Sequence, residues 1–126
     1  MNFYAAGAAA LLASGIILHV FLAGRTVHAD MQAALEGFPK ALESATWHGV
    51  SLWLGLHFVL ALVAVFYAHP MMTGALVFGA LHAGLLGIVC LAMSLHLCNS
   101  WTAMRQSYLF MLISGALAGA AVASVV

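Results

Sequence analysis

The longest uncharged stretch of the sequence constrains the fold more than any other feature. Between Glu43 and Arg105 there is no Asp, Glu, Lys or Arg. As one helix, this stretch would be roughly 90 Å long at about 1.5 Å per residue, about three hydrocarbon thicknesses of a membrane. It must therefore fold back on itself. Pro70 favours a turn at 67–70, because proline disfavours helix in the residue before it and suits the first position of a new helix.

Composition places the whole chain in a membrane. Of the 126 residues, 66% are hydrophobic and 5% are charged, far from the composition of soluble domains. The formal net charge is zero, so no basic field attracts nucleic acid, and we expect no nucleic-acid partner. The sequence predicts one integral membrane domain over 1–126, with the lipid bilayer as its main partner.

An all-α, transmembrane four-helix bundle follows from the apolar runs. The first run has no charged residue and matches the roughly 20 residues that a membrane helix needs, whereas a secretory signal peptide would have a basic start and a shorter apolar core. Asn99 and Ser100 offer N-cap side chains for the last helix. The predicted spans are about 2–24, 45–68, 71–98 and 101–125.

The segment 26–44 is predicted to be an interfacial loop that begins with a short helix. It holds most of the charged residues and is broken by Gly37 and Pro39. Because Arg25, Lys40 and Arg105 fall on one face of the predicted bundle, that face is expected to be cytoplasmic. This orientation predicts a multi-pass protein of the bacterial cytoplasmic (inner) membrane with both termini outside.

Histidine is the unusual residue type in this chain. Of seven histidines, five fall inside the predicted spans, where ionisable side chains are costly and by default mark a function. Counted from the cytoplasmic helix ends at about 1.5 Å per residue, His19 lies about 7 Å deep, His48 about 5 Å and His96 about 3 Å. Three histidines from three helices are thus expected to share one layer.

The faces of the predicted helices select the same residues. Small side chains mark the sides on which membrane helices pack closely, and those sides carry His19, His48 and His96, with His82 deeper in the bundle. Tyr108 shares such a face in the last span and is expected to donate a hydrogen bond to a ligand. His57 lies about 180° from His48 on its helix, so we expect His57 to face lipid or a second copy of the protein.

Two main interpretations of these histidines stay open. In the first, His19, His48 and His96 bind haem b or a transition metal such as copper or zinc, for electron transfer, sensing or cofactor handling. In the second, the histidines hydrogen-bond across helices, and the protein is an accessory or assembly subunit of a larger membrane complex. The glycine and alanine faces favour a homo-oligomer or contacts with other membrane subunits.

Transport and catalysis are less well supported by the sequence. A small-solute or proton-linked transporter would need its histidines to relay protons, since no Asp or Glu lies inside a predicted span. The serines inside the spans have no carboxylate to complete a catalytic triad. We therefore do not expect an enzyme.

Two short motifs, His19-Val-Phe-Leu-Ala-Gly24-Arg25 and Thr46-Trp47-His48-Gly-Val-Ser51-Leu-Trp53-Leu, carry a resemblance. The chain resembles uncharacterised small bacterial four-helix integral membrane proteins that have a histidine late in helix 1 and a Trp-His pair at the start of helix 2. The resemblance covers roughly the first half of the chain. It implies the four-helix fold and draws attention to His19 and His48, but it implies no activity.

Overall fold

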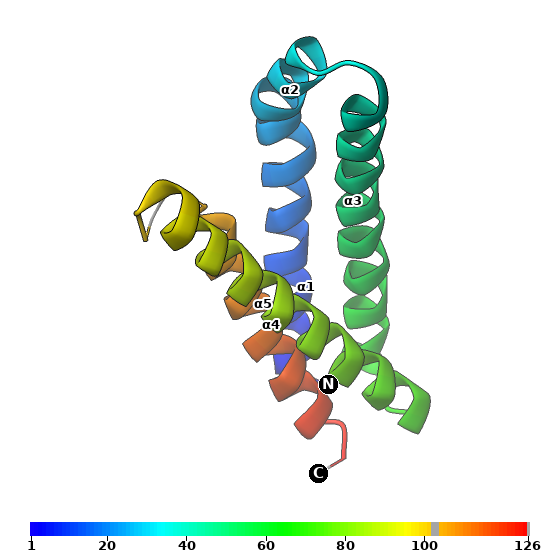
Figure 1. The fold of residues 1–126 in the computed structure, drawn as a ribbon. Helices are drawn as coiled ribbons and strands as arrows, with labels where there is room; N and C mark the ends of the chain where they lie inside the picture. Colours follow the sequence, from blue (N-terminus) through cyan, green and yellow to red (C-terminus); the bar gives the residue numbers. More distant parts are fainter. Residues whose placement is uncertain (102–103, 126) are drawn as a thin grey trace.

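The computed structural model describes residues 1–101 and 104–125, and within them the chain is helical and forms no strand. The first helical rod is continuous and consists of α1 (Phe3–Ile16), the π-helical segment η1 (Ile17–His28) and α2 (Ala29–Ala34). It is followed by α3 (Gly37–Phe66), α4 (Pro70–Cys98) and α5 (Gln106–Val122) (Figure 1). The predicted all-α class is confirmed for this part of the chain.

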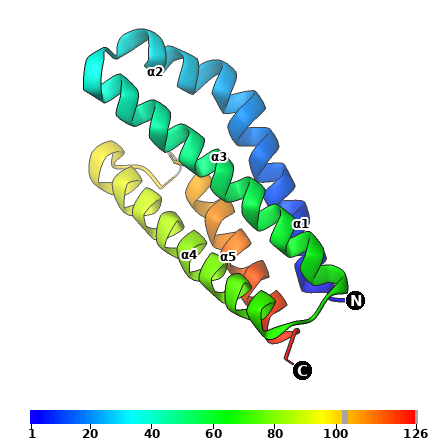
Figure 2. The ribbon, with the colours of Figure 1, turned by 90° about the vertical axis from the view of Figure 1, so that its right-hand side faces the viewer.

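The helices pack as two antiparallel pairs. The first pair is α1 with α3 and the second is α4 with α5, while α1 also packs against α5. Figure 1 shows the α4–α5 pair inclined to the α1–α3 pair, so that the two pairs meet toward the termini and diverge toward the opposite end. Both chain termini lie at the same end of the molecule, as Figures 1 and 2 show.

The core lies where the two pairs meet. Ala8 and Leu12 of α1, together with Ile113 and Leu117 of α5, are fully buried, and Leu54 of α3 is nearly so. Small side chains on α1 allow this close approach, which is the usual way in which helices pack in lipid.

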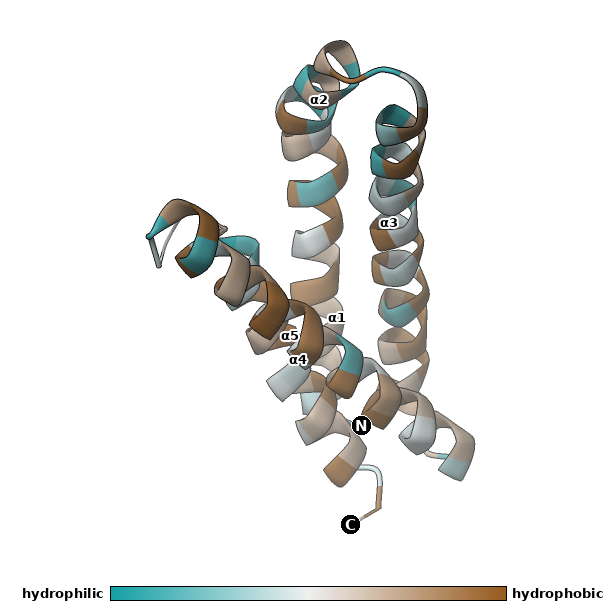
Figure 3. Cartoon of the chain, in the orientation of Figure 1, coloured by the Kyte–Doolittle hydropathy of each residue, from teal (hydrophilic) through white to brown (hydrophobic). Residues whose placement is uncertain are grey.

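Within residues 1–101 and 104–125, three helices are long and apolar enough to cross a membrane: the rod Phe3–Ala34, α3 and α4. The apolar α5 has 17 residues and is shorter. Figure 3 shows hydrophobic residues along most of each helix and hydrophilic residues gathered near α2 and the start of α3. The geometry therefore fits an integral membrane protein, because the surfaces that face outward are largely apolar.

The predicted turn at 67–70 is confirmed. α3 ends at Phe66 and α4 begins at Pro70, as expected for a proline in the first turn of a helix. The His69 side chain caps α4, because its Nδ1 accepts a hydrogen bond from the Met71 backbone N–H at 3.2 Å. The α3–α4 hairpin is thus fixed by a local signal that is visible in the sequence.

The segment 26–44 begins with helix, as predicted, but the loop predicted after that helix is wrong from Gly37 onward. Within 26–44 only Leu35 and Glu36 interrupt the helices, and α3 begins at Gly37 rather than near residue 45. Gly37 adopts a left-handed φ of 58°, which allows the sharp entry into α3. Pro39 does not break the helix, because the backbone N–H groups of a first helical turn have no partner within the helix.

The start of the last helix also differs from the prediction. α5 begins at Gln106 instead of near 101, and residues 102–103 of the predicted span lie outside the described residues. Asn99 does not cap the following helix. It adopts the left-handed conformation, with φ 48°, and ends α4 as its C-cap. Asparagine tolerates this conformation well and serves at either helix end, so its presence alone does not fix which helix it caps.

Candidate functional site

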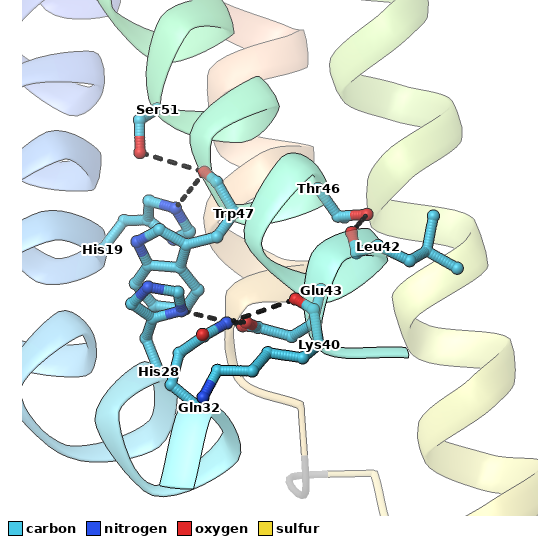
Figure 4. A network of polar contacts seen from close by, with 9 residues as sticks. All are labelled: His19, His28, Gln32, Lys40, Leu42, Glu43, Thr46, Trp47 and Ser51. Carbon is cyan, nitrogen blue, oxygen red and sulfur yellow. Dashed lines mark hydrogen bonds and ion pairs between the residues drawn. The ribbon is translucent and has the colours of Figure 1, made fainter. Parts of the chain in front are cut away.

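The main cluster of aromatic and polar side chains lies between η1 and the start of α3. The indole of Trp47 is stacked between two imidazoles, with the His19 ring centroid 4.0 Å away and the His28 ring centroid 4.6 Å away (Figure 4). The interplanar angles are 19° and 16°. Stacked ring pairs contribute about 0.5–1.5 kcal/mol each beyond the area they bury, so this stack joins η1 firmly to α3.

The π-helical winding of η1 places both histidines on one side. His19 and His28 are nine residues apart, which in an α-helix of 100° per residue would put them on opposite faces. A π-helix has about 4.4 residues per turn, so nine residues complete roughly two turns and return to the same face. Gly24 lies between them on this face, and a Cβ there would be 3.7 Å from the Trp47 ring. This is an ordinary van der Waals distance, so an alanine at this position would also fit against the indole.

A carboxylate fixes the orientation of His28. The His28 Nδ1 lies 2.8 Å from Glu43 Oε1, and the other carboxylate oxygen accepts a hydrogen bond from the Gln32 side chain (Figure 4). Glu43 belongs to the charged first turns of α3, outside its apolar part. The hydrogen bond from His28 is the main cause that lowers the pKa of the Glu43 carboxyl, with a further contribution from Gln32. Glu43 is therefore a carboxylate at neutral pH.

The Trp47 backbone carbonyl is a second anchor of the cluster. It lies 3.2 Å from His19 Nε2 and accepts a hydrogen bond of 3.0 Å from Ser51 Oγ (Figure 4). When His19 Nε2 donates to this carbonyl, the neutral ring keeps its lone pair on Nδ1. Both histidines of the stack thus have one ring nitrogen engaged in a hydrogen bond and a defined ring orientation.

His48 lies beside this cluster at the protein surface. Its ring is edge-on to His28, with the ring centroids 6.1 Å apart, and the side chain is exposed. His48 also interacts electrostatically with the Glu43 carboxylate. The structure therefore brings His19 and His48 to the same end of the α1–α3 pair.

The remaining members of the predicted site are not part of this cluster. His96 is exposed in the last turn of α4, at the end that diverges from the α1–α3 pair (Figure 1). Tyr108 is exposed and donates a hydrogen bond to the Trp101 carbonyl at 2.8 Å. Over residues 1–101 and 104–125, no group of three or more His, Cys, Asp or Glu side chains is arranged to hold a metal ion.

The expectation that His57 faces lipid is wrong. His57 is 4% exposed and lies against Gly79 of α4, whereas His48 is the exposed one of the two. The His57 Nδ1 lies 2.9 Å from the Trp53 carbonyl, and its ring stacks on the Trp53 indole at 4.4 Å. His82 of α4 approaches the same indole, with a centroid distance of 5.3 Å. The rings of these three side chains form an aromatic contact between α3 and α4, in which His57 is buried and the other two are half-buried.

Two functional candidates, His28 and Glu43, are not found by sequence reasoning. Both fall in the segment that is expected to be an interfacial loop, so neither is assigned to a helix face. The pairing of His28 with Glu43 also depends on the π-helical winding, which no hydropathy pattern reveals. The only signal in the sequence is the mixture of histidine and carboxylate in a segment flanked by two apolar runs.

Comparison of the chain with protein-family models, with curated proteins and with solved structures found no match in any of the three. The candidate site is therefore defined by its own geometry.

Proposed function

We propose that this integral membrane protein binds a transition-metal ion, such as zinc or copper, through His28 and His48, and serves in metal sensing or handling. The observation that carries the proposal is the 2.8 Å contact between His28 Nδ1 and the Glu43 carboxylate. Metal-binding histidines typically donate their second ring N–H to a carboxylate or carbonyl, which fixes the tautomer and makes the free nitrogen more basic. In His28 that free nitrogen is Nε2.

The second ligand in this proposal is His48. Metal–imidazole bonds are about 2.0–2.1 Å long, so two imidazoles on one ion have ring centroids up to about 6 Å apart. The 6.1 Å separation of His28 and His48 lies at that limit. Because His48 is exposed, its side chain can rotate toward the ion without disturbing the core.

Two protein ligands leave coordination positions for water or for an exchanging partner. Such a site suits reversible binding better than permanent storage, since closed structural metal sites have a complete set of protein ligands. Neutral imidazole binds zinc, copper and nickel alike, so the ligand set favours this group of ions over magnesium or calcium.

Haem b fits the cluster less well than a bare ion. A haem held by two axial histidines needs space for a flat macrocycle between the rings. Between His19 and His28 that space is filled by the Trp47 indole (Figure 4). His96, the third predicted ligand, is on a different helix pair. The cluster therefore does not favour haem binding.

Zinc or copper titration of the purified protein in mild detergent tests the proposal. We expect about one ion per chain for the unmodified protein, and loss of that binding in His28→Ala and His48→Ala. Glu43→Gln keeps a hydrogen-bond acceptor but removes the charge, and is expected to weaken binding about 10- to 100-fold. His96→Ala is the matched control, an exposed histidine outside the cluster, and is expected to bind as tightly as the unmodified protein.

Two results would overturn the proposal. One is a chain that binds neither ion although its circular dichroism shows folded helices. The other is a His96→Ala variant that loses the ion while His28→Ala retains it. That result would favour the ligands predicted from the sequence, His19, His48 and His96.

An accessory subunit without chemistry of its own is the second candidate. The observation in its favour is that large apolar side chains of α3 and α4 are exposed, among them Leu52, Leu56, Phe78 and Leu81. This candidate predicts that His28→Ala and His48→Ala change only the stability of the protein. It also predicts that the protein extracted in mild detergent elutes in a complex with other membrane subunits.

A further inference from the structure

The winding of η1 and the histidine stack depend on each other. The π-helical segment extends over 12 residues, whereas π-helix in proteins is usually a single turn. None of its residues is buried, so no core packing imposes this winding. The main contacts that join η1 to α3 are the rings of His19 and His28 on Trp47, the contact of His19 Nε2 with the Trp47 carbonyl, and the hydrogen bond of His28 with Glu43.

The alternative structure for η1 is an α-helix, because the α-helix is the more stable winding for an ordinary sequence. Changing from about 80° to 100° per residue over these residues would rotate the far end of η1 by more than half a turn. His28 would then leave the side that faces α3 while His19 stayed close to its present position. The linker of Leu35 and Glu36, outside any helix, is placed to absorb the rotation.

We infer that η1 is a two-state element: the Trp47 indole, held between His19 and His28, keeps it π-helical, and loss of this stack returns it to α-helix. The consequence for the site, which rests on the proposed function, is regulation of metal binding. In the π-helical state His28 lies beside Glu43 and His48, and in the α-helical state it is turned away. A metal ion that binds His28 and His48 therefore favours the π-helical state, because a ligand stabilises the conformation to which it binds more tightly.

Spin-label distances measure the winding directly. One label is placed on η1 at exposed Val27 and one on α3 at exposed Leu52, after the native Cys90 and Cys98 are replaced by alanine. A rotation of half a turn moves a label across the helix, a displacement on the order of 10 Å. In the metal-free protein we expect one distance distribution, and in Trp47→Ala a second distribution displaced by about that amount.

Two controls keep the result interpretable. Trp101→Ala removes an exposed indole elsewhere and is expected to leave the Val27–Leu52 distance unchanged. Labels at exposed Leu85 of α4 and Leu112 of α5 report whether Trp47→Ala keeps the second helix pair intact. If that reporter shows that Trp47→Ala is unfolded, the milder His19→Ala, which removes one face of the stack, takes its place with the same expected displacement.

The outcomes separate this inference from the proposed function. An unchanged Val27–Leu52 distance in a folded Trp47→Ala protein overturns the two-state element, whatever the metal titrations give. A displaced distance supports it, and weaker zinc binding in that variant, with His28, Glu43 and His48 all retained, extends the support to regulation of the site. A displaced distance in a chain that never binds zinc or copper supports the switch and overturns the proposed function.

Discussion

At the scale of single residues, the position of His57 depends on a glycine in another helix. A Cβ at Gly79 would lie 2.4 Å from His57 Cδ2 and 2.8 Å from Nε2, closer than real side chains approach. The small residues of α3 lie on the side of His48 and so predict that His57 points away from the bundle. That prediction is wrong. The room for the buried imidazole comes from α4, and this pairing between helices cannot be read from either helix alone.

Substitution of Gly79 tests this contact. In Gly79→Ala the added methyl group must displace the His57 ring, and overpacking of this kind costs about 1–3 kcal/mol. Thermal unfolding followed by circular dichroism in detergent should show a lower transition temperature. Gly74→Ala is the matched control on the same helix, because a Cβ there would have nothing within 4 Å and alanine favours helix by up to about 1 kcal/mol. Equal stability of the two variants would show that His57 is not packed against Gly79.

The residues of the candidate site are predictable only in part. His19 and His48 can be identified because each lies at a helix end with a countable depth. His28 escapes this reasoning because a periodicity of 100° per residue places it opposite His19. Counting residues along an α-helix predicts neither the burial of His57 nor the position of His28. The first depends on a glycine in another helix, and the second depends on the π-helical winding of η1.

At the scale of secondary-structure elements, the sequence locates turns better than it locates helix ends. The turn at 67–70 is marked by a proline and the observed α4, Pro70–Cys98, nearly matches the prediction. The predicted start of α3 is misplaced because charged residues indicate where a helix leaves lipid and not where its hydrogen bonding stops. α3 has Lys40 and Glu43 in its first turns, so its helical hydrogen bonding begins within the charged segment.

A buried hydroxyl at the end of α4, that of Ser94, bonds to the described residues on both sides of 102–103. Ser94 has no exposed surface, and its Oγ donates to the Ser100 carbonyl at 2.6 Å and accepts from the Met104 N–H at 3.2 Å. Ser94→Ala leaves a buried backbone group without this partner, which costs about 1–3 kcal/mol. We expect a lower unfolding temperature and faster hydrogen exchange at the end of α4.

Ser14→Ala provides the comparison for that variant. Ser14 is exposed and its hydroxyl bonds only to the Ala10 carbonyl of its own helix, so its loss is expected to have little effect. If both serine variants unfold at the temperature of the unmodified protein, the stability of the protein does not depend on the Ser94 hydroxyl.

At the scale of the whole molecule, Asn2 joins the two helix pairs near the termini. Its side-chain oxygen accepts from the Ala5 N–H at 3.0 Å and so caps α1, while its Nδ2 donates to the Ala120 carbonyl of α5 at 2.8 Å. Its backbone N–H donates to the Val65 carbonyl of α3. One residue therefore contacts three helices at the end where the pairs meet.

Two substitutions separate these roles of Asn2. Asn2→Ala removes both side-chain bonds and is expected to destabilise the protein by about 1–2 kcal/mol. Asn2→Asp keeps the capping oxygen and removes the donor to Ala120, so its stability should lie between those of Asn2→Ala and the unmodified protein. Chemical unfolding in detergent measures both, and an Asn2→Asp variant as unstable as Asn2→Ala would show that the cap contributes little.

The number of membrane crossings decides the topology of the whole chain. In the part of the chain that the structure describes, three helices are long enough to cross, and the 17 residues of α5 equal the lower limit of about 17 for a membrane helix. In the structure both termini lie at one end of the molecule, which requires an even number of crossings if each helix spans the bilayer (Figure 1). The basic residues Arg25, Lys40 and Arg105 predict that the termini lie outside the cytoplasm.

Reporter fusions at each terminus in bacteria test this topology. Alkaline phosphatase, which is active only outside the cytoplasm, should be active at both ends, and green fluorescent protein, exported in unfolded form, should be dark at both. Termini on opposite sides would mean that α5 does not cross and that the chain has three spans. Both termini inside would retain four crossings but reverse the orientation, and would place the cluster of His28, Glu43 and His48 on the outer side of the membrane, where a metal ion would reach it from outside the cell.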